Sequence, residues 1–172
     1  SNVYGMFSNA DLEFEDAVDK DGNKHPLTQG TFIKYLESDD RELRRSAFRN
    51  LYKAYGAYNN TLAATLTGEV KKHVFNARTH NYKTAREKAL SNNHIPEAVY
   101  DNLVKTVHKY LPLLHRYTQL RKDVLGLEDM KMYDLYTPLV KDIKFEMPYD
   151  EAVEWMLKAL EPMGDEYLDV VK

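Results

Sequence analysis

The chain of 172 residues has no cysteine and no large surplus of either charge, and each absence excludes a class of protein. Without cysteine there is no disulfide framework, no thiolate metal site and no cysteine nucleophile. The 24 lysine and arginine residues face 27 aspartate and glutamate residues, whereas a nucleic-acid-binding domain carries a basic surplus. No apolar run approaches the roughly 18–20 residues that span a bilayer. The sequence predicts a cytoplasmic protein that binds neither nucleic acid nor membrane.

Both ends of the chain are apolar. Val3, Tyr4 and Met6 lie close to the first residue, and residues 167–171 form a helical pattern with no glycine or proline after it to end the helix. Chain ends are more often polar and frayed. We therefore expect the chain to be a segment of a longer protein.

Residues 11–27 predict a β-hairpin, because partial alternation of apolar residues is followed by a polar turn at Gly22, which is free to adopt positive φ. The same turn has the composition of a calcium loop. With Gly22 at loop position six, however, Ala17 and Thr28 would occupy the first and last positions, where carboxylates are required. A solvated turn is the favoured interpretation.

After the hairpin the pattern becomes helical. Thr28 is a candidate N-cap for a short helix that ends near Leu36. Ser38 and Asp39 offer N-caps for a much longer helix, whose apolar residues recur every three or four positions to about Asn76. Unbroken, that helix would be roughly 55 Å long. Two glycines inside it mark close packing, a bend or a break: Gly56 and Gly68.

The second half of the chain contains another long helical pattern. Thr84 and Glu87 fit a capping box for a short helix. Pro96 then suits the first turn of a long helix that ends before Gly126. Pro112 falls inside this helix and predicts a kink.

The last third predicts shorter elements. Residues 143–147 suit a strand, and Pro148 precedes a helix that Pro162 interrupts. A last helix is expected from about Gly164. The predicted fold class is mainly α, with long antiparallel helices and one small β-hairpin near residues 11–27.

Histidines and paired carboxylates are the first candidates for chemistry. No two histidines are four residues apart, the spacing that grips a metal from one helix face. The six are His25, His73, His80, His94, His108 and His115. Acid pairs with this spacing on one predicted helix include Glu97 with Asp101, and Asp150 with Glu154. A functional acid pair needs burial to separate the two pKa values, so surface or packing roles are favoured.

A basic run and a tyrosine stripe follow on the first long helix. The basic run comprises Arg41, Arg44, Arg45, Arg49 and Lys53. A solvated face with i,i+4 pairs such as Asp40 with Arg44 is favoured over a phosphate site. The tyrosines Tyr52, Tyr55 and Tyr58 favour packing over a ligand platform. The residues alone therefore predict no catalytic or metal-binding residue in this chain, and its substrate-binding residues are unknown.

Several stretches together resemble one peptidase family. They are residues 28–38, 40–42, 47–48, 51–52, 81–87, 92–100, 114–117 and 132–136, which include Thr28-Gln29-Gly30-Thr31-Phe32 and Met132-Tyr133-Asp134-Leu135-Tyr136. In this order they resemble oligoendopeptidase F, within the thimet-oligopeptidase-like zinc metallopeptidases. The resemblance spans nearly the whole chain.

The resemblance implies a large helical metallopeptidase fold in two halves around a deep channel, and hydrolysis of short peptides. In that family zinc is held by the two histidines of an HExxH helix and a glutamate on a later helix, and the HExxH glutamate is the general base. No HExxH occurs among these 172 residues. The resemblance therefore implies zinc in the parent enzyme and none bound by this segment.

The resemblance also implies an organisation. Residues 1–80 would end the N-terminal helical region, with the hairpin and a long helix, and residues 81–172 would begin the peptidase domain. The segment would supply scaffold and channel wall, with the stretch 132–136 bordering the channel or packing beneath it. Its partners would be short peptides and the remainder of its own chain. The alternative hypothesis is a free-standing helical module that binds a protein through its tyrosine-rich face.

Overall fold

The computed structural model describes residues 2–140 and 147–171. The chain divides into two compact units, Ser1–Leu139 and Val140–Lys172. No helix in the described residues has the length and apolar content needed to cross a membrane. The predicted division into residues 1–80 and 81–172 stays a prediction.

The first unit begins with α1 (Asn2–Met6) and a π-helical turn, η1 (Phe7–Asp11), neither of which was predicted. A hairpin of β1 (Ala17–Val18) and β2 (Lys24–His25) follows, with antiparallel pairing. Gly22 has φ +83° in the turn. This agrees with the prediction, because glycine has no Cβ and adopts positive φ without strain. The predicted hairpin is confirmed, although its strands are shorter than the range 11–27.

Three helices continue the unit: α2 (Gln29–Leu36), α3 (Arg41–Gly56) and α4 (Asn59–Thr79). Thr28 caps α2 as predicted, because its hydroxyl accepts a hydrogen bond from the Thr31 backbone N–H at 3.0 Å. An unbroken helix to about Asn76 is wrong, and the alternative of a break at Gly56 is confirmed, because α3 ends at Gly56 and α4 begins at Asn59. The predicted N-caps Ser38 and Asp39 are wrong as well, because Asp40 caps α3.

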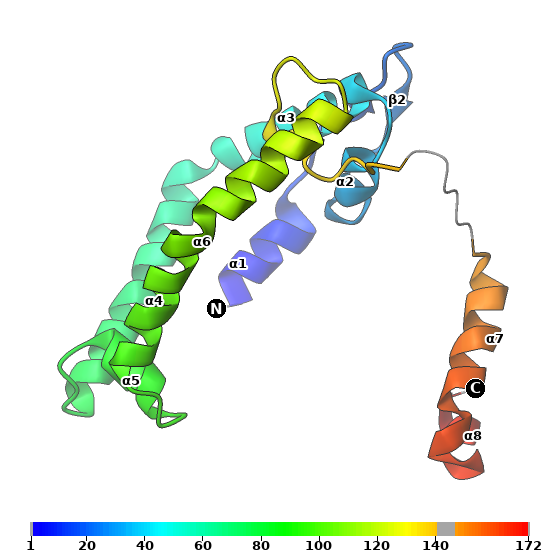
Figure 1. Cartoon of the computed structure of the whole chain (residues 1–172). Coiled ribbons are helices and arrows are strands. Elements are labelled where there is room, and N and C mark those ends of the chain that lie inside the picture. Colours follow the sequence, from blue (N-terminus) through cyan, green and yellow to red (C-terminus); the bar gives the residue numbers. More distant parts are fainter. Residues whose placement is uncertain (1, 141–146, 172) are drawn as a thin grey trace. The chain divides into compact units, whose positions relative to one another are not determined.

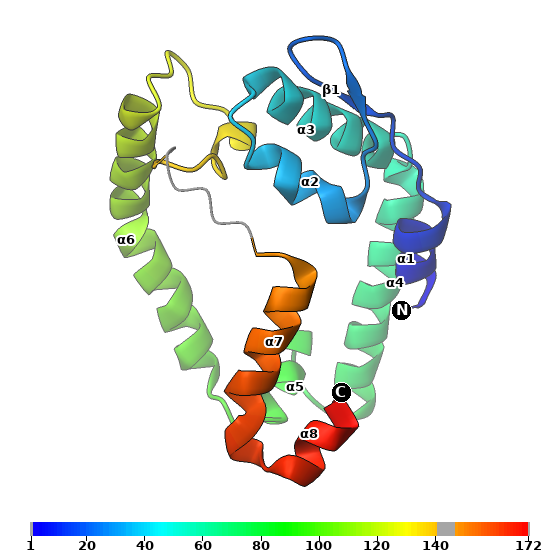
Figure 2. The ribbon, with the colours of Figure 1, turned by 90° about the vertical axis from the view of Figure 1, so that its right-hand side faces the viewer.

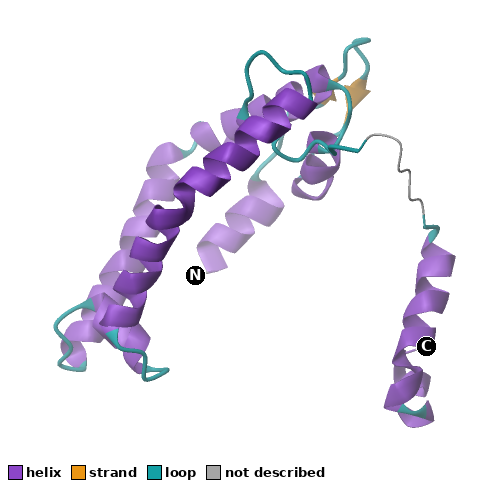
Figure 3. Ribbon diagram, viewed as in Figure 1, coloured by secondary structure: helices purple, strands orange, loops and turns teal. Residues whose placement is uncertain are grey.

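The remaining elements of this unit are α5 (Ala85–Ser91), α6 (Glu97–Val124) and η2 (Met132–Asp134), a short 3-10 turn. Pro112 lies inside α6, and Gly126 follows the helix with φ +66°. Helices α4 and α6 run in opposite directions, and α5 lies near the ends where they approach each other (Figures 1 and 2). The predicted class, mainly helical with long antiparallel helices and a small hairpin, is confirmed (Figure 3).

The second unit contains α7 (Tyr149–Leu160), the 3-10 turn η3 (Glu161–Met163) and α8 (Asp165–Val171). Pro148 precedes α7, and the interruption predicted at Pro162 falls in η3. Gly164 has φ +92°, which lets the chain turn before α8. The strand predicted at residues 143–147 lies outside the described residues except for Met147, which belongs to no strand.

The buried core of the first unit lies where the hairpin, α2 and α3 meet. Partly buried aromatic residues from the same elements surround it. The buried members are Ala17, Leu27, Leu43, Ala47 and Leu51, and Phe14, Phe32, Tyr35 and Tyr55 pack around them. Leu43, Ala47 and Leu51 share one face of α3 at steps of four residues, as helical periodicity predicts.

Candidate functional site

A buried carboxylate, Asp134 in η2, is the centre of a polar cluster. Its side chain is inaccessible to solvent. Arg41 donates from Nε to Oδ1 at 3.2 Å and from Nη2 to Oδ2 at 2.9 Å. Arg44 donates from Nη2 to Oδ1 at 2.8 Å, and the backbone N–H of Lys131 donates to Oδ2 at 2.9 Å. We call Arg41, Arg44 and Asp134 the α3–η2 clasp.

The electrostatics of the clasp keep Asp134 ionised. Burial acts to raise the pKa of Asp134, but the hydrogen bonds from Arg41 and Arg44 outweigh it and hold the pKa below its ordinary value. The same contact with Asp134 raises the pKa of Arg41. Both carboxylate oxygens are occupied by donors and shielded from water, so Asp134 is poorly placed to accept a proton from a substrate. Its chemistry here is to join two segments about 90 residues apart.

Aromatic contacts surround the clasp. Tyr133 packs edge-on to Phe48 of α3, with ring centroids 5.9 Å apart, and the Arg41 guanidinium lies over the Tyr133 ring at 5.5 Å. On the α6 side, Arg121 donates to the Thr137 carbonyl oxygen. The stretch 132–136 thus packs through Tyr133 and Asp134, whereas Met132 and Tyr136 are exposed.

The basic run does not form one solvated face. Arg44 is only 3% exposed, and besides Asp134 it binds the carbonyl oxygens of Ser38 and Asp39. The predicted pair of Asp40 with Arg44 is wrong, because the Asp40 carboxylate caps α3. Arg45 does pair with Glu42 on the surface.

The histidines lie apart from one another. His25 Nε2 is 2.9 Å from Asp19, and His73 Nε2 is 3.3 Å from Glu69. Among the residues that the structure describes, no group of three or more histidines, aspartates and glutamates could hold a metal ion.

The Asp19 carboxylate in the hairpin turn is occupied by hydrogen bonds from the turn itself. The Asp19 carboxylate accepts from the backbone N–H groups of Asp21 at 3.0 Å and Asn23 at 2.8 Å. Contacts with His25 first, and then with Asn23, hold the pKa of Asp19 well below its ordinary value. These protein donors occupy the oxygens that a calcium ion would need.

The acid pair on α6 shares one cation. Arg86 of α5 binds Glu97 at 2.6 Å and Asp101 at 2.9 Å, so the pair joins α5 to α6. The hydrogen bond that Arg86 donates to the Glu97 carboxylate raises the pKa of Arg86. The other pair, Asp150 with Glu154, is exposed on α7. Packing roles therefore explain the first pair.

The tyrosine stripe divides among different surroundings. Tyr55 packs against the core, and Tyr58 lies edge-on to Phe7 with ring centroids 5.0 Å apart. Tyr52 contacts Phe48 yet is 55% exposed. Two of the three tyrosines thus serve packing within the unit.

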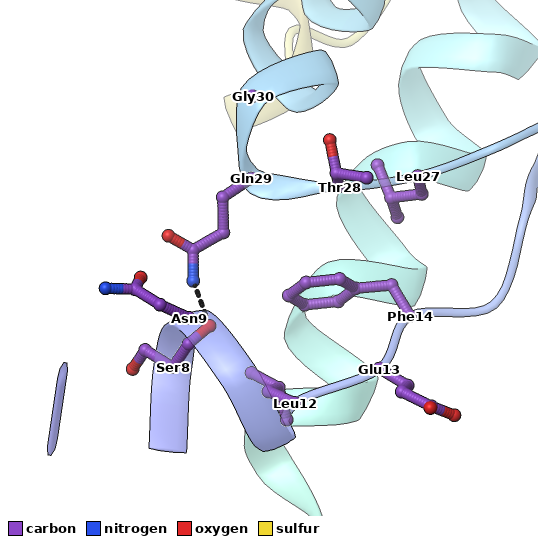
Figure 4. Close-up of a pocket in the computed structure, with 9 residues that line it drawn as sticks. All are labelled: Ser8, Asn9, Leu12, Glu13, Phe14, Leu27, Thr28, Gln29 and Gly30. Carbon is purple, nitrogen blue, oxygen red and sulfur yellow. Dashed lines mark hydrogen bonds between the residues drawn. The ribbon is translucent and has the colours of Figure 1, made fainter. Parts of the chain in front are cut away.

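An open pocket of about 510 Å³ lies between η1 and the start of α2 (Figure 4). The Gln29 side-chain amide crosses its edge and donates to the Ser8 carbonyl oxygen at 2.7 Å. Its lining consists of Ser8, Asn9, Leu12, Glu13, Phe14, Leu27, Thr28, Gln29 and Gly30. Glu13 is the one carboxylate in this lining, and no histidine stands beside it. The pocket therefore lacks a set of groups for peptide hydrolysis.

The sequence patterns do not predict the clasp. Arg41 and Arg44 belong to the basic run and Asp134 to a stretch that resembles the peptidase family, and neither pattern pairs them. Ion pairs between residues so far apart leave no periodic or spacing signal in a single sequence. Lys131 and Tyr133 precede Asp134 in a short turn, and this local sequence does not indicate that Asp134 binds arginines about 90 residues away.

Known proteins similar to this chain are peptidases. Oligopeptidase PepF of Bacillus subtilis is 56% identical over 172 residues, which are 100% of this chain and 26% of the relative. The chromosomal oligoendopeptidase F of Lactococcus lactis subsp. cremoris is 42% identical over 97% of this chain and 28% of the relative. The chain thus spans about a quarter of the length of these curated relatives.

Solved structures share the fold. The crystal structure of oligoendopeptidase-F from Enterococcus faecium matches 98% of this chain and 31% of that chain, with TM-score 0.78 and 45% identity. A protein from Chlamydophila abortus matches 99% of this chain and 28% of that chain, with TM-score 0.80 and 35% identity. The model of peptidase family M3 matches residues 34–163. Because this match covers well over half of the residues, the chain belongs to peptidase family M3.

Proposed function

We propose that the chain is a scaffold segment of a zinc-dependent oligoendopeptidase that hydrolyses short peptides in the cytoplasm. The observation that carries this proposal is the 56% identity to a Bacillus subtilis oligopeptidase over all 172 residues, which are 26% of that protein. Membership of family M3 supports the reaction class, and the names of the relatives support short peptides as substrates.

The residues of this chain do not fit the family's zinc site. The sequence contains no HExxH, and the described residues include no group of three or more histidines and carboxylates that could hold a metal. We therefore assign the metal ligands and the general base to residues outside these 172, and no catalytic role to any residue within them. When bound, zinc would supply a Lewis acid and an activated water.

The scaffold role follows from how the polar groups are used. Asp134 binds Arg41 and Arg44 inside the first unit, and Arg86 joins α5 to α6. Such contacts fix helices relative to one another. In the proposed arrangement residues 1–80 end an N-terminal helical region, and residues 81–172 begin the peptidase domain and contribute to the channel wall.

Two cleavage assays test the proposal, one on the 172-residue chain and one on a chimera. A quenched fluorescent peptide of about five to ten residues is first incubated with the 172-residue chain, with and without added Zn²⁺. No cleavage above the buffer is expected, and chelator-sensitive cleavage would overturn the scaffold role. A chimera is then made from Bacillus subtilis PepF, with its matching residues replaced by this chain. We expect the chimera to cleave the peptide and to lose activity when a chelator is added; a folded but inactive chimera would contradict the proposal.

A further inference from the structure

Helix α6 exposes an unusual amount of apolar surface for its length. At 28 residues it is about 42 Å long, and the one buried residue in it is polar, Arg121. Eleven large apolar side chains of α6 are each at least 40% exposed. They are Val99, Tyr100, Leu103, Val104, Val107, Tyr110, Leu113, Leu114, Tyr117, Leu120 and Val124.

These side chains share one broad side of the helix. At about 100° per residue the eleven positions cover roughly 200° of the circumference, which we call the α6 apolar arc. The charged residues Asp101, Lys105, Lys109, Arg116 and Asp123 fall on the opposite side, whereas Arg121 lies within the arc and is buried. An apolar stripe that faces one neighbour is about 100° wide. The width of the arc therefore suits a helix packed on two sides.

The first unit itself leaves this arc uncovered. Polar contacts fix α6 near its two ends. At the N-terminal end Arg86 binds Glu97 and Asp101, and at the C-terminal end Arg121 donates to the Thr137 carbonyl oxygen. Between these points the ribbons of α4 and α6 diverge (Figure 2). Soluble monomers rarely expose a continuous apolar patch larger than a few hundred Å². The arc is therefore expected to have a covering partner outside the first unit.

We propose that the α6 apolar arc is covered on two sides by segments of the same peptidase polypeptide that lie outside these 172 residues. This inference rests on the proposed function. The chain aligns along its full length with relatives of which it makes up 26–28%, so nearly three quarters of such a protein is available as the partner. A second copy of the chain, paired helix to helix through α6, would cover one stripe and leave the other part of the arc in water.

The chimera with Bacillus subtilis PepF provides the first test. Leu103→Asp and Leu114→Asp place a charge in the arc, and His108→Asp places the same charge on the opposite, exposed side of α6. We expect each arc variant to lower the yield of soluble, cooperatively unfolding chimera at least about tenfold relative to His108→Asp, because an unpaired carboxylate is costly to bury. Equal yields for arc and control variants would overturn the proposal, as would an unsubstituted chimera that does not fold.

A milder substitution keeps the test independent of complete misfolding. Leu114→Ala should raise the unfolding equilibrium constant of the chimera roughly 30-fold or more, the effect of truncating a buried leucine. In the 172-residue chain, where Leu114 is 57% exposed, the same change should alter that constant less than about threefold. Equal effects in the two proteins would contradict the inference.

Two further outcomes separate the claims. A stable dimer of the 172-residue chain in sedimentation analysis, abolished by Leu114→Asp and not by His108→Asp, would overturn the proposal in favour of a second copy. A chimera that is folded and sensitive to Leu114→Ala, yet does not cleave peptides, would overturn the proposed function and support the interface. An active chimera that is insensitive to Leu114→Ala would overturn the interface and leave the proposed function standing.

Discussion

Helices α3 and α6 differ in how the first unit uses them. Helix α3 buries Leu43, Arg44, Ala47 and Leu51 within 16 residues, whereas α6 buries Arg121 alone within 28. Both carry apolar residues at helical spacing, so their sequences predict equally good packing faces. The difference shows that the internal cohesion of the unit is concentrated where the hairpin, α2 and α3 meet.

The same contrast bears on local stability. The α3 region combines an apolar core with a buried ion cluster, while α6 is fixed by polar contacts near its ends. Regions with few buried apolar contacts open at lower free energy than packed ones. We therefore expect amide hydrogens in the middle of α6 to exchange earlier than those of α3.

The largest effect is expected from Asp134→Asn, which breaks the α3–η2 clasp. The variant keeps the shape of the side chain but leaves Arg44 buried without its carboxylate. Removing one partner of a buried ion pair costs about 3–5 kcal/mol. Urea unfolding followed by circular dichroism measures the loss.

The matched control for this change is Glu42→Gln, which removes the exposed partner of Arg45. Exposed pairs contribute about 0–1 kcal/mol, so this variant should unfold close to the parent midpoint. If both substitutions lowered stability equally, the clasp would not stabilise the contact of α3 with η2 as the geometry indicates.

A pair of leucine truncations compares the two regions directly. Leu36 at the end of α2 is 2% exposed and Leu103 on α6 is 59% exposed. Leu36→Ala should cost about 2–5 kcal/mol, and Leu103→Ala in the 172-residue chain about 0.5 kcal/mol or less. Thermal and urea unfolding of both variants gives the comparison. A large effect of Leu103→Ala would show that α6 is already packed in this chain.

Local features of the structure were predictable from the sequence. Thr28 caps α2, Gly126 takes a positive φ after α6, and Pro148 stands before α7. Each depends on the chemistry of one residue and its neighbours within a turn. The core face of α3 was predictable for a similar reason, since helical spacing alone aligns its apolar residues.

Features that depend on distant residues were not predictable. Asp40 rather than Ser38 or Asp39 caps α3, and its other carboxylate oxygen accepts from the Lys20 backbone N–H in the hairpin turn. The clasp likewise joins residues far apart in the chain. Gly56 indicates a possible break, but the apolar spacing continues through residues 56–59 and so does not distinguish a break from a bend.

Acid should destabilise the α3–η2 clasp less than Asp134→Asn does. The folded-state pKa of Asp134 lies below its ordinary value of 3.8, because the hydrogen bonds from Arg41 and Arg44 outweigh burial. Its stabilising contribution is therefore complete above about pH 4 and is lost as pH falls toward the folded-state pKa. The contribution of Asp134 to the urea midpoint should stay constant from about pH 7 to 5. It should decline below about pH 4. The Asp134→Asn variant should show a shallower decline. Asp19→Asn serves as a control, because the pKa of Asp19 is also lowered.

A smaller effect than that of Asp134→Asn or Leu36→Ala is expected at Asp40, where two roles can be separated. Its Oδ1 accepts from the Glu42 backbone N–H at 2.9 Å as the N-cap of α3, and its Oδ2 accepts from the Lys20 N–H at 2.8 Å. Asp40→Ala removes both contacts and should cost about 1–2 kcal/mol. Asp40→Asn keeps a good cap but offers an amide N–H toward Lys20, so it should recover most of the loss if capping dominates. Recovery by asparagine with faster amide exchange at Lys20 would show that the α3 region depends on its cap more than on the hairpin contact. If Asp40→Asn is as unstable as Asp40→Ala, the lost stability comes from the contact with the hairpin instead.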